Sequence, residues 1–228
     1  MRAFYSDRFI LPLPEGHRFP MVKYARVRER SLAEGVLRPA ELAEPPAAAW
    51  EELALVHDAA YLERVRDGTL APLDQRRIGF PWSPQMVERS RRSVGATIAA
   101  GRVALDETAE RGWGIAANLA GGTHHAYPGH GEGFCVFNDA AVAIRVLQCE
   151  GRIHRAVVLD CDVHQGNGTA AVFATDPSVF TFSIHGARNY PFRRERSTRD
   201  VELPDRADDE VFLAALEMHL PGLLEEFR

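Results

Sequence analysis

The sequence contains little cysteine, no long apolar segment and no excess of basic residues. Its three cysteines, Cys135, Cys149 and Cys161, are odd in number and lack CxxC spacing, which favours reduced thiols in a cytoplasm. No stretch of about 18 apolar residues is present to cross a membrane, and residues 1–9 lack the apolar core of a signal peptide. With 27 basic and 32 acidic residues the net charge is −5, so no basic surface argues for nucleic-acid binding.

The composition is typical of one soluble globular domain. Of the 228 residues, 46% are hydrophobic and 26% are charged, which is enough to bury a large single core. Apolar runs of strand length alternate with segments of helical spacing, and the sequence has no internal repeat. This alternation predicts a parallel sheet with helices on both faces, formed by residues 1–228 as a single domain. The oligomeric state is left open.

The expected elements follow one another along the chain. Strands are expected at residues 2–5, 53–56, 113–119, 156–159 and 179–185. Helices are expected at residues 21–34, from Pro84 after a Ser83 cap, from Asn138 or Asp139, at residues 169–175, and from about Asp209 through Leu224. Residues 68–82 are expected to form a loop of a length that is often functional.

One strand ends in a cluster of polar side chains. Ala156 to Leu159 are apolar, and Asp160, Asp162 and His164 follow at every second position. Because side chains alternate across a strand, these three emerge on one side of its carboxyl end, where ligands bind in open α/β sheets. Burying such groups unpaired costs on the order of several kcal/mol, so a cation or a tight hydrogen-bond network must compensate. Asp with His favours a zinc-type metal, and a hydrogen-bonded strand end is the alternative.

A second cluster consists of adjacent histidines in a glycine-rich loop. His124 and His125 lie within residues 121–139, which also contain five glycines. Unperturbed histidine titrates near pH ~6.5, so both imidazoles are suited to proton transfer. This second cluster decides what a metal at the first cluster would do.

Together these motifs resemble the histone deacetylase and acetylpolyamine amidohydrolase superfamily. The resemblance is carried by GGTHHA, GFCVFNDAA, LDCDVHQGNGT and VFTFSIH, which begin at residues 121, 133, 159 and 179. It implies an α/β fold of the arginase/deacetylase type, with three layers and a central, mostly parallel sheet flanked by helices. It also implies a metal-dependent amidohydrolase that removes acetyl groups from lysine side chains or related acetylated amines.

Two ion sites are implied by the resemblance. Asp162 and His164 are the implied ligands of the catalytic metal, expected to be Zn²⁺, with Fe²⁺ or Mn²⁺ as alternatives. Such a metal would polarise the amide carbonyl and lower the pKa of its bound water toward ~7. A structural K⁺ site is implied at Asp160, Asp162, His164, Ser183 and Ile184.

The resemblance also implies roles for the residues that move protons. His124 and His125 would act on the attacking water and the departing amine. Asp160 would orient His124. Asn167 stands where some relatives have a second aspartate, so His125 is expected to be less basic than it would be beside a carboxylate.

The implied substrates are acetylated lysine, an acetylated polyamine or a small acetylated amine. Gly133 and Phe134 match the stretch that lines the acyl-lysine tunnel, and Phe192 would form the opposing wall. A narrow apolar channel suits the methylene stem of lysine. Ordinary core packing is the alternative explanation for both phenylalanines. No nucleic-acid or membrane partner is expected.

The end of the chain departs from the family pattern. The family's third metal ligand, an aspartate, and its oxyanion-binding tyrosine would both follow the last helix, and the sequence ends at Arg228. The chain is therefore expected to lack its C-terminal part, as a piece of a longer enzyme, as a truncated product with little activity, or as one completed by another subunit. Two other functions stay open, namely a noncatalytic acyl-lysine or polyamine binder and a manganese ureohydrolase of similar fold.

Overall fold

A computed structural model describes residues 1–227, apart from the side chain of residue 224. The chain divides into two compact units, Met1–Ile153 and His154–Arg228. Each unit contains a three-stranded sheet, and every strand pair described is parallel. Within residues 1–227 no helix combines the length and the apolar character that a membrane span requires. The single domain expected for residues 1–228 stays a prediction.

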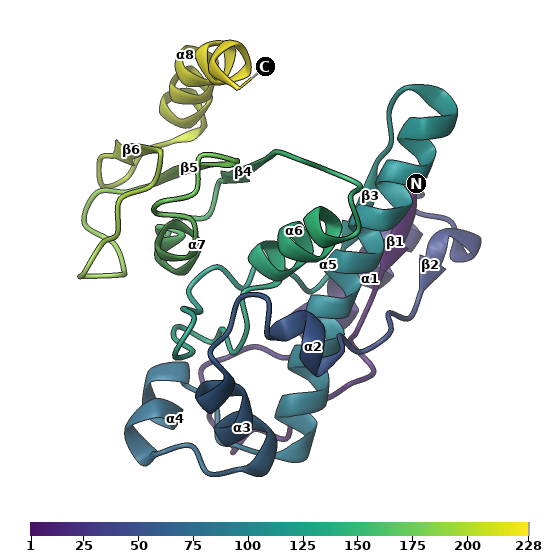
Figure 1. Cartoon of the computed structure of the whole chain (residues 1–228), viewed down its shortest axis with the longest axis vertical. Helices are drawn as coiled ribbons and strands as arrows, with labels where there is room; N and C mark the ends of the chain where they lie inside the picture. Colours follow the sequence, from purple (N-terminus) through teal and green to yellow (C-terminus); the bar gives the residue numbers. More distant parts are fainter. Residues whose placement is uncertain (228) are drawn as a thin grey trace. The chain divides into compact units, whose positions relative to one another are not determined.

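The first unit is built around one long helix on a short sheet. Strands β1 (Arg2–Phe4), β2 (Leu42–Ala43) and β3 (Ala116–Asn118) are ordered β2-β1-β3. Helix α5 (Pro84–Arg111) packs against β1 and β3, as Figure 1 shows. Small residues of α5, Ala96 and Ala100, contact Phe4 and allow this close approach. Strand β3 ends at Asn118, directly before the loop of residues 119–138 that contains His124 and His125 (the histidine loop).

Helices α2 (Trp50–Leu53), α3 (Ala59–Asp67), α4 (Pro72–Ile78) and α6 (Asp139–Cys149) form the main hydrophobic core of the first unit with α5. Helix α1 (Lys23–Ala33) has no buried residue, and a 3₁₀ turn lies at Pro39–Glu41. Two predicted caps are confirmed. The Ser83 hydroxyl accepts from the Met86 N–H at 3.1 Å, and the Asn138 side chain accepts from the Ala141 N–H at 3.0 Å. These short-range bonds begin α5 and α6.

The second unit holds strands β4 (Ala156–Asp160), β5 (Val179–Gly186) and β6 (Arg199–Leu203) in the order β4-β5-β6. Its helices are α7 (Asn167–Val172) and α8 (Asp209–Glu226), and α8 packs on β6 (Figure 1). The central strand β5 is buried except for its last residue. A core of Phe180, Phe182, Ile184, Val201 and Leu223 joins the sheet to α8.

Two expectations about elements are wrong, and two strands, β2 and β6, lie outside the expected set. Residues 53–56 are not a strand, because α2 includes Leu53 and the Glu52 carboxylate accepts from the Ala49 N–H at 2.7 Å, which begins a helix. Residues 68–82 are not one loop, since α4 lies within them and ends at Gly79 with φ +85°. Strand β6 was not expected, because its alternating charges obscure a single inward apolar residue, Val201.

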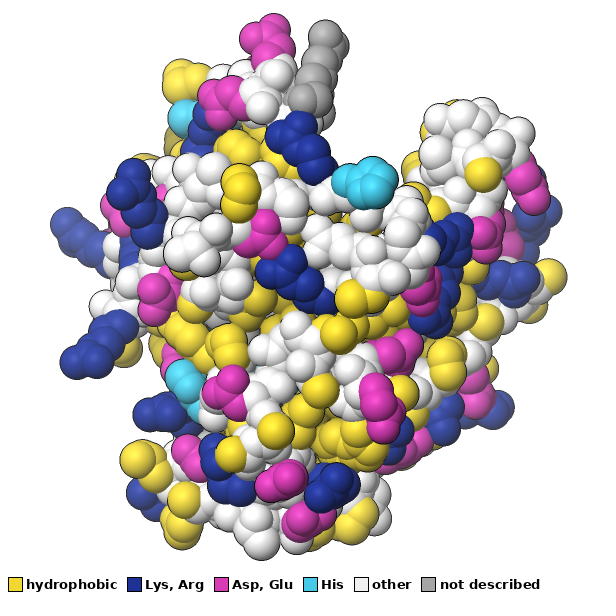
Figure 2. All heavy atoms as spheres, viewed as in Figure 1, with side chains coloured by type: hydrophobic (Ala, Val, Ile, Leu, Met, Phe, Trp, Pro, Cys, Tyr) yellow, Lys and Arg dark blue, Asp and Glu magenta, His cyan; other side chains and the backbone are white. Residues whose placement is uncertain are grey.

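The surface carries charges of both signs. On the face drawn in Figure 2, Lys and Arg side chains are interspersed with Asp and Glu. Side chains of opposite charge also pair within one unit, such as Arg28 with Asp7 at 2.8 Å. This face shows no continuous basic stripe of the kind that follows a nucleic-acid backbone.

Helix α5 packs directly against the backbone of residues 45–48 at Gly95. A Cβ built on Gly95 would lie 2.0 Å from the Pro46 carbonyl oxygen. That segment is held in place, because Ala48 N–H donates to Arg91 O at 3.0 Å and the Arg92 guanidinium donates to Pro45 O at 2.7 Å. We therefore expect Gly95→Ala to lower the free energy of unfolding by about 1–3 kcal/mol.

The matched control for this prediction lies on the same helix. A Cβ on Gly101 would lie 2.7 Å from the flexible end of Leu147, which can move aside. Gly101→Ala gains the same helix propensity and should change stability by less than about 1 kcal/mol. Urea titration of both variants tests the difference. Equal stabilities would show that contact with the backbone at Pro46 does not constrain position 95.

Candidate active-site residues

The predicted histidine pair lies in the loop between β3 and α6 of the first unit. The rings of His124 and His125 are adjacent, with centroids 4.0 Å apart and planes inclined by 46°. His125 is buried and His124 is half-buried. Two imidazoles at this distance can contact the same small group from one side, as proton-transfer residues must.

A buried histidine that the sequence gave no reason to select supports this loop. The Nδ1 atom of His57 lies 3.0 Å from the Tyr127 carbonyl oxygen, and its Nε2 accepts from the Asn138 N–H at 3.1 Å. The two contacts fit a neutral ring that carries its hydrogen on Nδ1. Burial lowers the pKa of His57 from 6.5 to about 4. His57 therefore ties the start of α3 to both ends of residues 127–138.

Asp160, Asp162 and His164 are brought together at the end of β4 in the second unit. Asp160 is the last residue of β4, so the regular alternation of a strand does not extend to the other two. Instead, Asp160 Oδ1 accepts from the Asp162 N–H at 3.0 Å, and Asp162 Oδ1 accepts from the His164 N–H at 2.8 Å. Two successive Asx turns thus place the three side chains.

The pair Asp162 and His164 fits two positions of a metal site. Asp162 Oδ1 and His164 Nδ1 are 3.0 Å apart. Two atoms that each lie about 2.1 Å from a tetrahedral zinc ion are separated by roughly 3.4 Å, so a small adjustment would suit both. The Asp162 and His164 side chains are 51% and 39% exposed, so they lose less contact with water than the sequence pattern predicts. Among residues 1–227 no group of three His, Cys, Asp or Glu side chains is placed to hold a metal.

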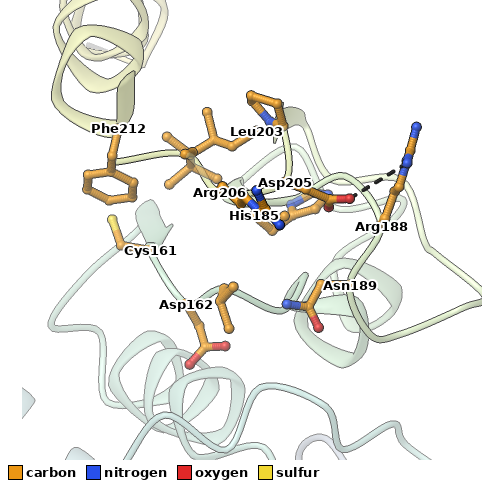
Figure 3. A pocket seen from close by; sticks show the side chains of 14 residues that line it. Cys161, Asp162, His185, Arg188, Asn189, Leu203, Asp205, Arg206 and Phe212 are labelled. Atoms are coloured by element: carbon orange, nitrogen blue, oxygen red, sulfur yellow. Dashed lines mark ion pairs between the residues drawn. The ribbon is translucent and has the colours of Figure 1, made fainter. Parts of the chain in front are cut away.

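A cavity of about 370 Å³ opens at the carboxyl ends of β4, β5 and β6. Its wall includes Cys161 and Asp162, which point in opposite directions, the Cys161 sulfur toward Phe212 and the Asp162 carboxylate away from it (Figure 3). Arg188 and Asp205 form an ion pair at 3.7 Å on its rim. The position of the cavity agrees with the rule that ligands of α/β sheets bind beyond the carboxyl ends of strands.

The other predicted ion-site residues also lie in the second unit. Ser183 is the register partner of Asp160 across β4 and β5, and Ile184 follows it in the buried strand. The Ser183 hydroxyl lies 3.0 Å from His185 Nδ1. Asn167 is buried at the first position of α7. The roles predicted for these residues stay predictions.

Gly133 and Phe134 form a strained turn in the first unit. Both have left-handed φ, +56° and +65°, which is unusual for a bulky residue such as phenylalanine. Backbone bonds to the end of α4 hold the turn, from Gly133 N–H to Arg77 O at 3.1 Å and from Phe134 N–H to Ile78 O at 2.7 Å. The Phe134 ring packs beside Phe19 at a centroid distance of 4.9 Å. Strain of this kind is concentrated at functional loops.

Phe192 lies in the second unit and is 93% exposed. Its ring contacts Tyr190 edge to face at 6.5 Å, and Tyr190 in turn lies 5.8 Å from the His164 ring. Core packing therefore does not explain Phe192. Its role as a tunnel wall stays a prediction.

Comparison with known proteins decides the family. The sequence profile of the histone deacetylase domain matches residues 17–228. The chain belongs to the histone deacetylase family. An uncharacterized protein of Picosynechococcus sp. is 44% identical over 226 residues, which cover 98% of this chain and 73% of that protein. The acetoin utilization protein AcuC of Staphylococcus aureus is 27% identical over 241 residues, covering 98% of this chain and 62% of AcuC.

Solved structures of histone deacetylase homologs confirm the fold class. A crystal structure of such a homolog in complex with SAHA, and one of a homolog from Aquifex aeolicus, each superpose with a TM-score of 0.82 at 25% identity. The superposition covers 100% of this chain and 65% of either homolog. The arginase/deacetylase type of α/β fold is therefore correct. The chain spans less than two thirds of the length of these homologs and of AcuC.

Three polar residues outside the predicted set support the histone deacetylase motifs. Asp139 and His57 contact the histidine loop, and the buried Gln165 side chain binds Glu195 O at 2.7 Å and Asp200 at 2.8 Å. The hydrogen-bond partners of these side chains lie 16 or more positions away in the sequence. Asp139 also stands at the start of a helix, where an ordinary cap is expected. For Asp139 and Gln165 the available signal was their place inside the motifs GFCVFNDAA and LDCDVHQGNGT, and for His57 the sequence gave none.

Proposed function

We propose that the chain belongs to a metal-dependent deacetylase that hydrolyses the amide of an acetylated lysine side chain, an acetylated polyamine or a small acetylated amine. The observation that supports the proposal most is the adjacent pair His124 and His125. The pair lies in a loop whose end at Asn138 is hydrogen-bonded to His57. Family membership supports the same reaction class.

The two imidazoles would divide the proton transfers between them. One, neutral, takes a proton from the water that attacks the amide carbon. The other, protonated, gives its proton to the amine nitrogen as the C–N bond breaks. The roles expected of Asp160 and Asn167, as groups that orient the histidines, stay part of this proposal.

Asp162 and His164 would hold the metal, as Zn²⁺ or alternatively Fe²⁺ or Mn²⁺. Their donor atoms, 3.0 Å apart, support the assignment. When bound, such an ion polarises a carbonyl group and makes water more acidic. A structural K⁺ near Asp160, Ser183 and Ile184 is the second ion of the proposal, supported by the adjacent positions of β4 and β5.

The substrate stem would contact Gly133, Phe134 and Phe192. The strained turn at Phe134 and the exposed ring of Phe192 support a role beyond packing. A noncatalytic acyl-lysine binder is the second candidate. It would keep the contacts with the substrate stem at Phe134 and Phe192 without hydrolysing the amide.

Zinc calorimetry together with hydrolysis of a fluorogenic acetyl-lysine peptide tests the proposal. Asp162→Ala should weaken zinc binding by more than about 100-fold, because loss of even a hydrogen-bond partner of a ligand costs 10- to 100-fold. The matched control is Asp67→Ala, which removes an exposed carboxylate paired with Arg66. Equal zinc affinity in Asp162→Ala would contradict the ligand assignment. Peptide binding without turnover at saturating zinc would favour the noncatalytic binder.

A further inference from the structure

Asp139, the first residue of α6, is a buried carboxylate held only by neutral donors. Its side chain is 2% exposed. Oδ1 accepts from the Thr123 N–H and the Thr123 hydroxyl, both at 2.7 Å. Oδ2 accepts from the Thr97 hydroxyl at 2.5 Å and from the Gly122 N–H at 3.1 Å. Four donors match the acceptor capacity of an ionised carboxylate, so its burial is compensated without a cation.

These bonds join three segments that are distant in the sequence. Thr97 lies in the middle of α5, Gly122 and Thr123 begin the histidine loop, and Asp139 starts α6. The positive end of the α6 dipole further favours a negative charge at this position. Asp139 thus fixes the histidine loop to the two helices of the first unit that pack on each other.

The attachment acts on the residue immediately before His124. Thr123 donates twice to Asp139, and its hydroxyl also accepts from the Asp139 N–H at 3.1 Å. The loop runs so close to the carboxylate that a Cβ on Gly121 would lie 2.6 Å from Asp139 Oδ2. Three bonds on Thr123 leave its backbone little freedom, and the direction of the next side chain depends on that backbone.

We propose that Asp139 is the positioning residue of the His124 and His125 pair, setting the angle of the two rings by fixing the backbone at Gly122 and Thr123. The inference rests on the proposed deacetylase function, in which these rings transfer protons. A residue that merely capped α6 would affect stability and leave the rings unchanged, so the two roles are separable.

Asp139→Asn tests the proposal with little change in shape. Each carboxylate oxygen accepts from one backbone N–H, of Thr123 or of Gly122. Whichever way the amide turns, its NH₂ group therefore faces a backbone N–H, and the loop must move. With ¹⁵N-labelled histidine, we expect the imidazole resonances of His124 and His125 to shift while those of His17, His154 and His219 stay in place. We also expect kcat to fall about 10- to 100-fold with little change in KM.

Two further variants keep the result interpretable. Ser83→Ala removes the N-cap of α5 and should lower the melting temperature by about 2–4 °C, yet it should leave the His124 and His125 resonances unchanged. If Asp139→Asn does not fold, Thr97→Val removes one donor to Oδ2 at nearly constant volume and should shift the same two resonances by a smaller amount. The histidine resonances are assigned with His124→Gln and His125→Gln.

Unchanged resonances of both rings in folded Asp139→Asn, or an equal shift in Ser83→Ala, would overturn the proposal. The readout does not depend on turnover. Shifted rings in a chain that hydrolyses no acetylated amine would support positioning by Asp139 and refute the proposed function.

Discussion

Replacing either His124 or His125 with glutamine is expected to lower kcat for an acetylated lysine peptide by about 100- to 10,000-fold. A positioned side chain that transfers a proton in the transition state contributes an acceleration of this size. Their rings, 4.0 Å apart, would share the two transfers, so the loss of either ring should slow the reaction. Stopped assays of hydrolysis measure the loss of kcat.

The same variants should leave zinc affinity within about twofold of the unmodified chain, because Asp162 and His164 supply the metal donors. His154→Gln is the matched control, since His154 is exposed and lies outside both groups. Undiminished kcat in both His124→Gln and His125→Gln would exclude proton transfer by this pair.

Acid is expected to destabilise the chain through His57 by about 3 kcal/mol between pH 6.5 and about 4. Burial lowers the pKa of His57 in the folded chain to about 4, whereas the unfolded chain keeps the ordinary value of 6.5. Between these values the unfolded state binds the proton and the folded state does not. The stabilisation is therefore complete above pH 6.5 and is lost as the pH falls toward 4.

His57→Gln isolates this contribution. Glutamine can donate to Tyr127 O and accept from the Asn138 N–H, as His57 does, but it does not titrate. We expect it to be less stable than the unmodified chain at pH 7.5 and to approach that chain's stability near pH 4.5 in urea titrations. His154→Gln should keep the full pH dependence. A constant gap between His57→Gln and the unmodified chain at every pH would contradict the neutral state of His57.

The elements that the sequence predicted correctly depend on neighbouring residues. Ser83 and Asn138 cap helices through bonds that reach only three positions along the chain. The run Val179 to Ile184 consists of apolar or small residues and lies in the central strand β5, as expected. Strand β6 was missed because its place beside β5 depends on pairing with a distant segment, which alternating charges do not indicate.

The residues of the candidate site were evident from the sequence, whereas their placement was not. Adjacent residues made the pair His124 and His125 evident from the sequence, and spacing by two made Asp162 and His164 evident as possible ligands. Their actual placement differs from the expected strand alternation, since Asx turns after Asp160 set the positions of Asp162 and His164.

By itself the sequence determined the family, the α/β fold class and the identity of the paired histidines, because motifs and periodicity are properties of neighbouring residues. Only the tertiary structure decided which groups hold those histidines. Thr97, Thr123 and Asp139 are up to 42 positions apart, and His57 is 81 positions from Asn138. Hydrogen bonds over such separations depend on the path of the whole chain, which no local pattern specifies.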